Sequence, residues 1–308
     1  MAPPAGARRV KVGRADFPPI AEAIGSALGT WVAPQPAAPV HGGSISDGFR
    51  WESGASPLFV KVGPEVAGTL FEREQEGLEA LAQSGAVTVP AVLARGRAGS
   101  CAFLVLEWLD LRSLNEAAQA ELGASLAALH RHQSARFGWE QPNFIGRTPQ
   151  PNAWSADWTW FFGEQRLRFQ LELACRNGHA ARLRSRGEEL LASLPRLLDG
   201  HRPPPSLLHG DLWAGNAAMT LRGSPVVFDP AVYYGDRESD LAMTRLFGGF
   251  GPAFYAAYEA AWPLPPGAEE RADLYNLYHV LNHLNLFGAG YLGQVQSLID
   301  ILLARLGR

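Results

Sequence analysis

A polar loop between two short apolar strands constrains this chain more than any other feature. Residues 209–216 read H-G-D-L-W-A-G-N and follow an apolar run, and a second apolar run, 226–228, ends in Asp229. The side chains of Asp211, Asn216 and Asp229 are therefore expected to gather in one cluster of loops. Taken singly, each would be interpreted as a cap or turn former, because short polar side chains bond nearby backbone. Their combination is what indicates chemistry.

Phosphoryl transfer needs this set of groups. One carboxylate, here Asp211, accepts or orients the proton of the attacking hydroxyl, while an amide and a second carboxylate hold Mg²⁺ against the nucleotide phosphates. Asn216 and Asp229 supply that amide and that carboxylate. The spacing H-G-D-x-x-x-x-N is that of the kinase catalytic loop, with Gly210 where protein kinases carry Arg. The sequence thus predicts a phosphotransferase that uses ATP and Mg²⁺.

Lysine is rare in this chain, which uses arginine for nearly all of its basic positions. Lys61 lies within the apolar run 58–62, which predicts a strand. A compact ammonium is not easily replaced there by a planar guanidinium, so Lys61 is a candidate for binding phosphate. The alternative is an edge-strand lysine that points into solvent.

Glu74 is the expected partner of Lys61. It lies four residues after Leu70 and four before Leu78, on the apolar stripe of a helix predicted over 65–83. A carboxylate on the buried face of a helix is costly unless it is paired, and the neighbouring strand offers Lys61. The less favoured alternatives lie off the stripe: Glu72 and Glu76.

A glycine-rich turn precedes that strand. Glycines let backbone N–H groups approach a phosphate closely, and serines add further donors. Within residues 41–48 the expected nucleotide-binding positions are Gly42, Gly43, Ser44 and Ser46. The alternative is an ordinary hairpin turn, since a glycine turn alone is weak evidence.

The chain is expected to form an α+β, two-lobed, protein-kinase-like fold. Residues 1–107 would form a small antiparallel sheet with the Glu74 helix, and residues 108–308 a larger, mainly helical lobe. Backbone at Glu107 and Leu109 could hydrogen-bond adenine where the lobes meet, although a plain linker is the alternative. Ser113 and Glu116 predict a capping box. The other helices are expected at 17–28, 113–133, 154–177 and 181–198.

Composition limits the classes of partner. The 308 residues are 47% hydrophobic and 19% charged, enough for two globular cores. A net charge of −3 gives no electrostatic footprint for nucleic acid or an anionic membrane. No apolar stretch is long enough to span a bilayer, and no signal-type apolar segment follows the N-terminus. Cys101 and Cys175 lack C-x-x-C spacing, which favours reduced thiols and a cytoplasmic location.

Several polar residues of the C-terminal half were considered for supporting roles. His209 and Asp240 are expected to brace the 209–216 loop rather than to react. Arg166 and Arg168 could steer an anionic substrate or could simply be solvated. One helix face could line a substrate cleft or be ordinary core: Tyr275, His279, Asn282 and His283.

The motif His209 to Asn216 resembles the H-G-D-L-W-x-G-N signature of the fructosamine kinase (ketosamine-3-kinase) family. The resemblance extends over nearly the whole chain. Trp213 is the most discriminating residue, because related small-molecule kinases share only H-G-D-x-x-x-x-N. The other matching segments are 42–46, 59–61, 71–74, 228–231, 235–238, 246–250 and 282–288.

The resemblance implies ATP-dependent phosphorylation of the sugar 3-hydroxyl of a free or protein-bound ketosamine, which reverses glycation because the product is unstable. By this resemblance Asp211 is the catalytic base, Asn216 and Asp229 bind Mg²⁺, and Lys61, held by Glu74, binds phosphate. Trp213 and His283 would contact the substrate.

Ser44 departs from part of that family. Some members carry a cysteine at this position, associated with disulfide-linked dimers, so a redox switch through this loop is not expected here, and a monomer is favoured over a dimer. Two alternatives to the ketosamine remain at this stage. One is another small-molecule hydroxyl, in an aminoglycoside, a choline-like alcohol or a sugar. The other is a nucleotide-binding module without catalysis.

Overall fold

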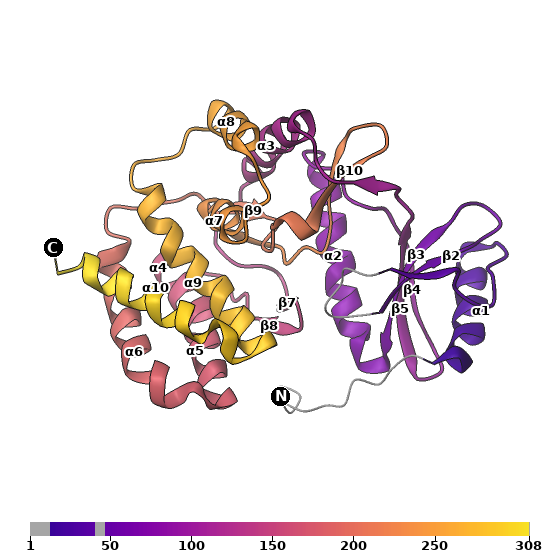
Figure 1. Ribbon diagram of the computed structural model, residues 1–308, viewed down its shortest axis with the longest axis horizontal. Helices are drawn as coiled ribbons and strands as arrows, with labels where there is room; N and C mark the ends of the chain where they lie inside the picture. The colour runs from indigo at the N-terminus through magenta and orange to yellow at the C-terminus, as the bar shows by residue number, and fades with distance from the viewer. Residues whose placement is uncertain (1–12, 41–46, 308) are drawn as a thin grey trace. The chain divides into compact units, whose positions relative to one another are not determined.

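The computed structural model describes residues 13–40 and 47–307, and these residues form two compact units (Figure 1). Unit 1 runs to Ala118 and takes in residues 215–230 from later in the chain; unit 2 consists of residues 119–214 and 231–308. The chain therefore passes from unit 2 into unit 1 between Ala214 and Gly215, inside the H-G-D-L-W-A-G-N loop. Strands and helices are both present in quantity, so the fold class is α+β.

Unit 1 contains a five-stranded antiparallel sheet in the order β1-β2-β3-β5-β4. The central strands β3 and β5 are apolar and buried, as expected for strands covered on both faces. In β3, Lys61 pairs with Leu104 of β5. The strand bounds are Ala38–Val40 for β1, Asp47–Trp51 for β2, Leu58–Pro64 for β3, Val92–Ala98 for β4 and Cys101–Glu107 for β5.

The sheet of unit 1 lies between helices α1 and α2 (Figure 1). Helix α1, Phe17–Leu28, has the bounds predicted from the sequence and ends at Gly29, whose φ of 65° suits a C-terminal glycine cap. Val60 and Val62 pack in the same core as α1. Because side chains alternate along a strand, Lys61 faces the other side, where α2 (Gly68–Ser84) lies.

A β-hairpin from the middle of the chain completes unit 1. Strands β10 (Ala217–Thr220) and β11 (Pro225–Val227) are antiparallel, and β10 also pairs with β6 (Leu111–Arg112). The backbone N–H of Val227 donates to Thr88 O at 3.0 Å, which fastens the hairpin to the connection before β4.

Unit 2 is mainly helical. Its short two-stranded sheet joins β9 (Ser206–Leu208) to β12 (Tyr233–Gly235), and a small hairpin joins β7 (Asn143–Ile145) to β8 (Thr148–Gln150). Helices α7 to α10 follow, and α7, α9 and α10 share a large apolar core with the earlier helices α5 (Phe169–Ala174) and α6 (Ala180–Leu197). Their bounds are Glu238–Leu246 for α7, Pro252–Ala261 for α8, Ala268–Phe287 for α9 and Leu292–Arg305 for α10.

Helix α3, Glu116–His130, corrects the predicted capping box. Asn115 accepts a hydrogen bond from the backbone N–H of Ala118 at 2.9 Å, which is the usual cap geometry. The helix therefore begins after Asn115, and the prediction of a cap at Ser113 is wrong. The sequence offered two short polar residues at this point, and the second is the one that ends the extended segment.

The two helices predicted over 154–177 and 181–198 form one nearly continuous run. It begins only at Trp158, because Asp157 caps it by accepting from Trp160 N at 3.0 Å. Gly178, with φ of 99°, places a kink before the last segment. The bounds are α4 Trp158–Phe161, a π-helical stretch Phe162–Arg168, α5 Phe169–Ala174, a π-helical stretch Cys175–His179 and α6 Ala180–Leu197.

Short 3₁₀ turns connect several of these elements. They lie at Arg14–Asp16, Glu65–Ala67, Ala214–Asn216 and Ala289–Tyr291. None of the helices in the described part of the chain combines the length and the apolarity that a bilayer crossing requires.

Acid is expected to destabilise unit 2 through His279, which is 3% exposed in α9. Burial lowers its pKa from 6.5 to about 3; nearby His283 and Arg166 act in the same direction, and Asp240 opposes them. As the pH falls below 6.5, His279 therefore takes up a proton in the unfolded chain, whereas in the folded chain it stays neutral until the pH approaches 3. Stability from this source is complete above pH 6.5 and is lost as the pH falls toward 3, by at most ~1.4 kcal/mol per pH unit.

Urea unfolding between pH 7 and pH 4.5 measures this effect. We expect the midpoint of His279→Gln to fall less steeply with acidification than that of the unaltered protein. Parallel pH profiles for the two proteins would show that His279 is not the group responsible.

Candidate active site

Lys61 is the centre of the charged site in unit 1. Its ammonium donates to Glu74 Oε1 at 2.5 Å and also to Asp229 Oδ1. Lys61 and Glu74 are 8% and 9% exposed, whereas about a third of the Asp229 side chain is accessible. The ion pair between the strand lysine and the helix glutamate, expected from the sequence, is therefore present. The third member comes from the end of the β10–β11 hairpin.

The charges in this cluster stabilise one another. Burial alone would lower the pKa of Lys61, but the carboxylates of Asp229 and Glu74 outweigh it and raise that pKa above its ordinary value. Burial raises the pKa of Glu74, opposed by Lys61 and assisted by Asp229. Lys61 is thus a fixed cation near neutral pH, with two carboxylates competing for it. An incoming phosphate would offer the same ammonium another anionic partner.

Asp229 has a backbone conformation that most residues avoid. Its φ is 56°, and it is the one non-glycine residue with positive φ in the described part of the chain. Aspartate tolerates this left-handed region better than most side chains, and such outliers are concentrated at functional sites. The turn after β11 therefore aims the carboxylate at Lys61 instead of continuing the strand.

The same hairpin brings Asn216 to this end of the sheet. Ala217 pairs with Val227, and the N–H of Phe228 donates to Asn216 O at 3.1 Å. Asn216 and Asp229 therefore lie next to the last rung of one hairpin, one at its beginning and one after its end. Both offer oxygen ligands, which is the donor chemistry that Mg²⁺ prefers.

The other predicted nucleotide-binding residues belong to two segments, the glycine-rich turn and the end of β5. The glycine-rich positions, Gly42, Gly43, Ser44 and Ser46, lie outside the described residues. At the end of β5, Glu107 N donates to Ala91 O and Glu107 Oε1 accepts from Ala91 N, both at 2.9 Å. These bonds use the amide of Glu107, so any adenine contact at this residue would have to use its carbonyl. Leu109 follows beyond the strand and is half-buried.

In unit 2 the loop that carries Asp211 is fastened to Asp240 of α7. Asp240 is 1% exposed; its Oδ2 accepts from His209 N at 2.7 Å, and its Oδ1 accepts from Gly210 N at 2.8 Å. Burial alone would raise the pKa of Asp240. The hydrogen bond and electrostatic attraction of His130, the electrostatic attraction of His209 and the hydrogen bond from Gly210 N outweigh burial and lower that pKa. An ionised carboxylate therefore holds the backbone just before Asp211.

The turn at Gly210 admits no other residue. Its φ is 83°, and a Cβ built on it would lie 2.0 Å from Ala231 O. Ala231 N in turn donates to His209 O at 2.8 Å. This close approach of two backbones explains why the catalytic-loop motif of this chain has glycine before Asp211.

His130 of α3 is a supporting residue that the sequence reasoning missed. Its Nε2 donates to Asp240 Oδ2 at 3.2 Å, and its Nδ1 lies 2.8 Å from the hydroxyl of Tyr258. All three side chains are buried. A lone histidine at the end of an apolar helix gives no signal in sequence, because its partners lie about 110 and 130 residues away.

Replacing Asp240 by Asn is expected to lower the free energy of unfolding by roughly 2–4 kcal/mol. The amide can accept at only one atom, so at least one buried donor among His209 N, Gly210 N and His130 loses its partner. Chemical denaturation measures the loss, with the exposed Asp199→Asn as the matched control. A decrease below about 1 kcal/mol would contradict this role of Asp240.

A buried polar network holds residues 231–232, the segment whose Ala231 N–H donates to His209 O. Asn143 donates to Val232 O at 2.7 Å, Gln150 donates to Ala231 O at 3.1 Å, and Arg166 donates to Asn152 Oδ1 at 2.7 Å. Arg166 is fully buried. It therefore cannot steer a substrate from the surface, and its guanidinium lies 4.0 Å from the ring centroid of Tyr233.

The predicted polar face of α9 is mostly interior. Tyr275, His279 and Asn282 are at most 3% exposed, and the Tyr275 hydroxyl donates to Asp236 at 2.5 Å. These three residues do not line a cleft. His283, one turn further on, is only partly buried and contacts exposed aromatic rings.

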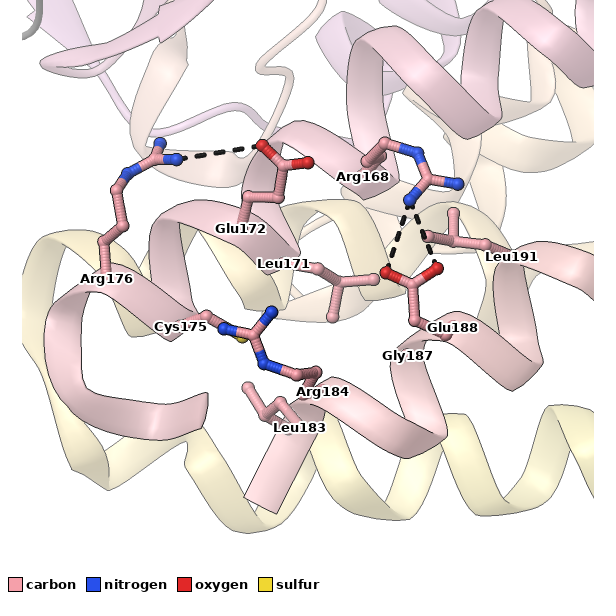
Figure 2. A pocket seen from close by; sticks show the side chains of 10 residues that line it. All are labelled: Arg168, Leu171, Glu172, Cys175, Arg176, Leu183, Arg184, Gly187, Glu188 and Leu191. Carbon is pink, nitrogen blue, oxygen red and sulfur yellow. Dashed lines mark hydrogen bonds and ion pairs between the residues drawn. The ribbon is translucent and has the colours of Figure 1, made fainter. Parts of the chain in front are cut away.

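A cavity of about 340 Å³ lies in unit 2 along the run from α5 to α6 (Figure 2). Ion pairs neutralise much of its lining: Arg176 pairs with Glu172, and Arg168 pairs with Glu188. Cys175 is a free cysteine at this cavity. Nothing here resembles a phosphoryl-transfer site.

His201, Asp236 and Glu238 also lie close together, but protein groups already engage them. His201 Nε2 is 2.6 Å from Asp236 Oδ2, and Glu238 accepts two bonds from Arg271, each at 2.7 Å. We interpret this cluster as a structural salt-bridge network.

Similarity to known proteins agrees with this geometry. The sequence profile of the fructosamine kinase family matches residues 17–305. A probable ketoamine kinase of Synechocystis is 43% identical over 281 residues, covering 91% of this chain and 94% of that protein. The chloroplastic protein-ribulosamine 3-kinase of Arabidopsis thaliana is 41% identical over 266 residues, covering 85% and 80%.

Comparison with solved structures supports the same family and fold. The crystal structure of a Thermobifida fusca protein, provisionally called a fructosamine-3-kinase, superposes with a TM-score of 0.82 at 32% identity, covering 92% of this chain and 98% of that one. Choline kinase LicA of Streptococcus pneumoniae superposes with a TM-score of 0.62 at 15% identity, covering 92% and 98%. The fold is therefore that of the protein-kinase-like phosphotransferases of small molecules. Within that class, this chain belongs to the fructosamine kinase family.

Proposed function

We propose that this protein is an ATP-dependent ketosamine kinase that phosphorylates the 3-hydroxyl of a sugar attached through C1 to an amine. The observation that carries the proposal is the Lys61 ammonium held by both Glu74 and Asp229, in a chain with the H-G-D-L-W-A-G-N loop. Family membership supports the choice of acceptor.

Unit 1 would bind the nucleotide. Lys61 would contact the phosphates, and Glu74 would keep the ammonium in place while Asp229 is drawn toward metal. The oxygens of Asn216 and Asp229 fit Mg²⁺, which would neutralise phosphate charge when bound. The glycine-rich turn, with Gly42, Gly43, Ser44 and Ser46, would cover the phosphates. Glu107 and Leu109 would contact adenine.

Asp211 would act on the acceptor. Its carboxylate would accept the hydrogen bond of the attacking hydroxyl and then its proton. Asp240, through the backbone of His209 and Gly210, would keep the loop in the geometry that presents Asp211. Trp213, exposed two residues further on, would contact the sugar.

A substrate panel tests the proposal. With Mg-ATP, fructosyl-lysine and ribulosyl-lysine should each release ADP, whereas free fructose, an aminoglycoside and choline should give rates at least about tenfold lower. The relatives are named for ketoamines and ribulosamines, so the two ketosamines are compared directly. Faster turnover of choline, a drug or a free sugar would show that the fold serves another acceptor. ATP binding without turnover of any panel member would contradict an enzymatic role.

A further inference from the structure

Five aromatic side chains form a continuous group beside the Asp211 loop, which we call the aromatic cluster: Trp213, Phe247, His283, Phe287 and Tyr291. Trp213 and Phe247 have ring centroids 6.3 Å apart, and Phe247 and His283 are 4.7 Å apart. Phe287 and Tyr291 lie 5.4 and 5.2 Å from His283. The rings come from the catalytic loop, the residue after α7, the end of α9 and the turn before α10. All belong to unit 2.

Much of this cluster is open to solvent. Trp213, Phe247 and Phe287 are 36%, 40% and 51% exposed. Single exposed apolar residues are ordinary, but a contiguous group of large rings indicates a binding surface. A group that begins two residues from Asp211 is positioned to bind the acceptor.

In the part of the chain that the structure describes, Lys and Arg side chains leave the exposed ring faces of the cluster unused. Arginines elsewhere lie over aromatic rings, as Arg237 does over Trp262 at 4.0 Å and Arg245 over Tyr255 at 4.6 Å. Within residues 13–40 and 47–307, no Lys or Arg lies over Trp213, Phe247 or Phe287. Aromatic faces attract cations, so these rings can accept one from a ligand.

His283 adds a hydrogen-bond acceptor to the rings. Its Nδ1 lies 2.8 Å from the carbonyl oxygen of His279 and must donate to it, because that oxygen can only accept. Burial lowers the pKa of His283, so the ring is neutral near pH 7 and Nε2 carries a lone pair. A neutral ring does not repel a cation, and its free lone pair can accept from an N–H⁺ group.

Two observations tie the cluster to Asp211. Gly249, with φ of 103°, packs so tightly that a Cβ on it would lie 2.3 Å from Cβ of Ala214, so the segment that follows α7 lies directly against the loop. After burial and other nearby groups, the charge of Asp211 contributes to raising the pKa of Tyr278, on the same helix as His283.

We propose that the aromatic cluster is the subsite for the protonated secondary amine of the ketosamine and for the first carbons of its substituent. The inference rests on the proposed function and specifies which part of the substrate the enzyme recognises. In a ketosamine, three carbon atoms link the oxygen at C3 to the nitrogen, so a cation must lie close to the hydroxyl presented to Asp211. Trp213, Phe247 and His283 surround the ammonium, and Phe287 and Tyr291 pack against the alkyl chain that follows.

A matched pair of acceptors tests this assignment. One is a fructosamine with an alkylamino group at C1, and the other is the 1-O-alkyl fructose in which an ether oxygen replaces the charged nitrogen. Both keep the 3-hydroxyl. The kcat/KM ratio of amine to ether is measured for the unaltered protein and for Phe247→Leu and Phe287→Leu, which keep apolar bulk and remove an aromatic face. Phe247→Tyr restores a face, and Trp160→Leu removes an exposed ring elsewhere in unit 2.

The amine is expected to be favoured over the ether by roughly 10-fold or more. Each Phe→Leu variant should reduce that ratio roughly 3- to 30-fold, mainly through KM for the amine. Phe247→Tyr should recover most of the ratio that Phe247→Leu loses, and the control Trp160→Leu should leave it unchanged. Phe287 lies at a helix end, so its variant tests the idea even if Phe247→Leu folds poorly.

Three results would overturn the assignment. Equal kcat/KM values for amine and ether in the unaltered protein would show that the charge of the nitrogen is not recognised, while the proposed ketosamine phosphorylation would still stand. Loss of both activities in parallel in the variants would show a general effect on the fold. Phosphorylation of neither compound would overturn the proposed function together with this inference.

Discussion

Replacing Asp211 by Asn is expected to reduce kcat for ketosamine phosphorylation by roughly 10³-fold or more. The amide keeps the size and hydrogen-bonding reach of the carboxylate but cannot take the proton of the acceptor hydroxyl, and general-base catalysis contributes about 10²–10⁴-fold. The loop backbone should be unaffected, because Asp240 holds it through His209 and Gly210.

The measurement is steady-state kinetics together with ATP affinity and the urea midpoint. ATP affinity and stability should stay within twofold and about 0.5 kcal/mol of the unaltered protein. Asp199→Asn, an exposed aspartate of the same unit, should retain full activity. Turnover within tenfold of normal in Asp211→Asn would remove Asp211 from the role of base.

Replacing Asp229 by Asn is expected to be as damaging, for a different reason. The substitution removes a carboxylate that binds Lys61 and that we assign to Mg²⁺, so kcat/KM should fall roughly 10³-fold. Asn also tolerates the left-handed conformation at φ of 56°, so the fold should survive. The Mg²⁺ concentration for half-maximal rate should rise in this variant and remain unchanged in Asp211→Asn.

Asp229→Ala separates the backbone from the chemistry. It should lose the same activity and in addition ~1 kcal/mol of stability, because alanine is strained in the left-handed region. If Asp229→Asn kept normal activity and normal Mg²⁺ dependence, Asp229 would not be a metal ligand.

Local patterns in the sequence predicted much of unit 1. Helix α1 has the predicted bounds because two prolines, an apolar stripe and Gly29 mark its ends independently of any distant contact. The pairing of Lys61 with Glu74 could be predicted because a buried charge on a helical stripe demands a partner, and one adjacent strand offered it. Family membership likewise follows from a short motif with strict spacing.

The remaining features depend on contacts between distant parts of the chain. The hairpin of β10 and β11 joins unit 1 although it follows the Asp211 loop of unit 2, because its strands pair with β6 and not with the strands of the helical unit. The approach of Asp229 to Lys61 requires a left-handed backbone conformation at Asp229. Aspartate tolerates that conformation, but its presence in a sequence does not predict it. His130 and the buried Arg166 find their partners through tertiary packing, so their sequence positions resemble those of ordinary helix residues.

Chemical identification of the product is the most direct test of the central claim. Purified protein is incubated with ATP, Mg²⁺ and fructosyl-lysine, and the sugar product is analysed by mass spectrometry and by phosphorus–proton correlation NMR. We predict one added phosphate per ketosamine, coupled to the proton at C3, and no such product from Asp211→Asn. An unmodified ketosamine in the presence of bound Mg-ATP, or phosphate on another position, would contradict the assignment.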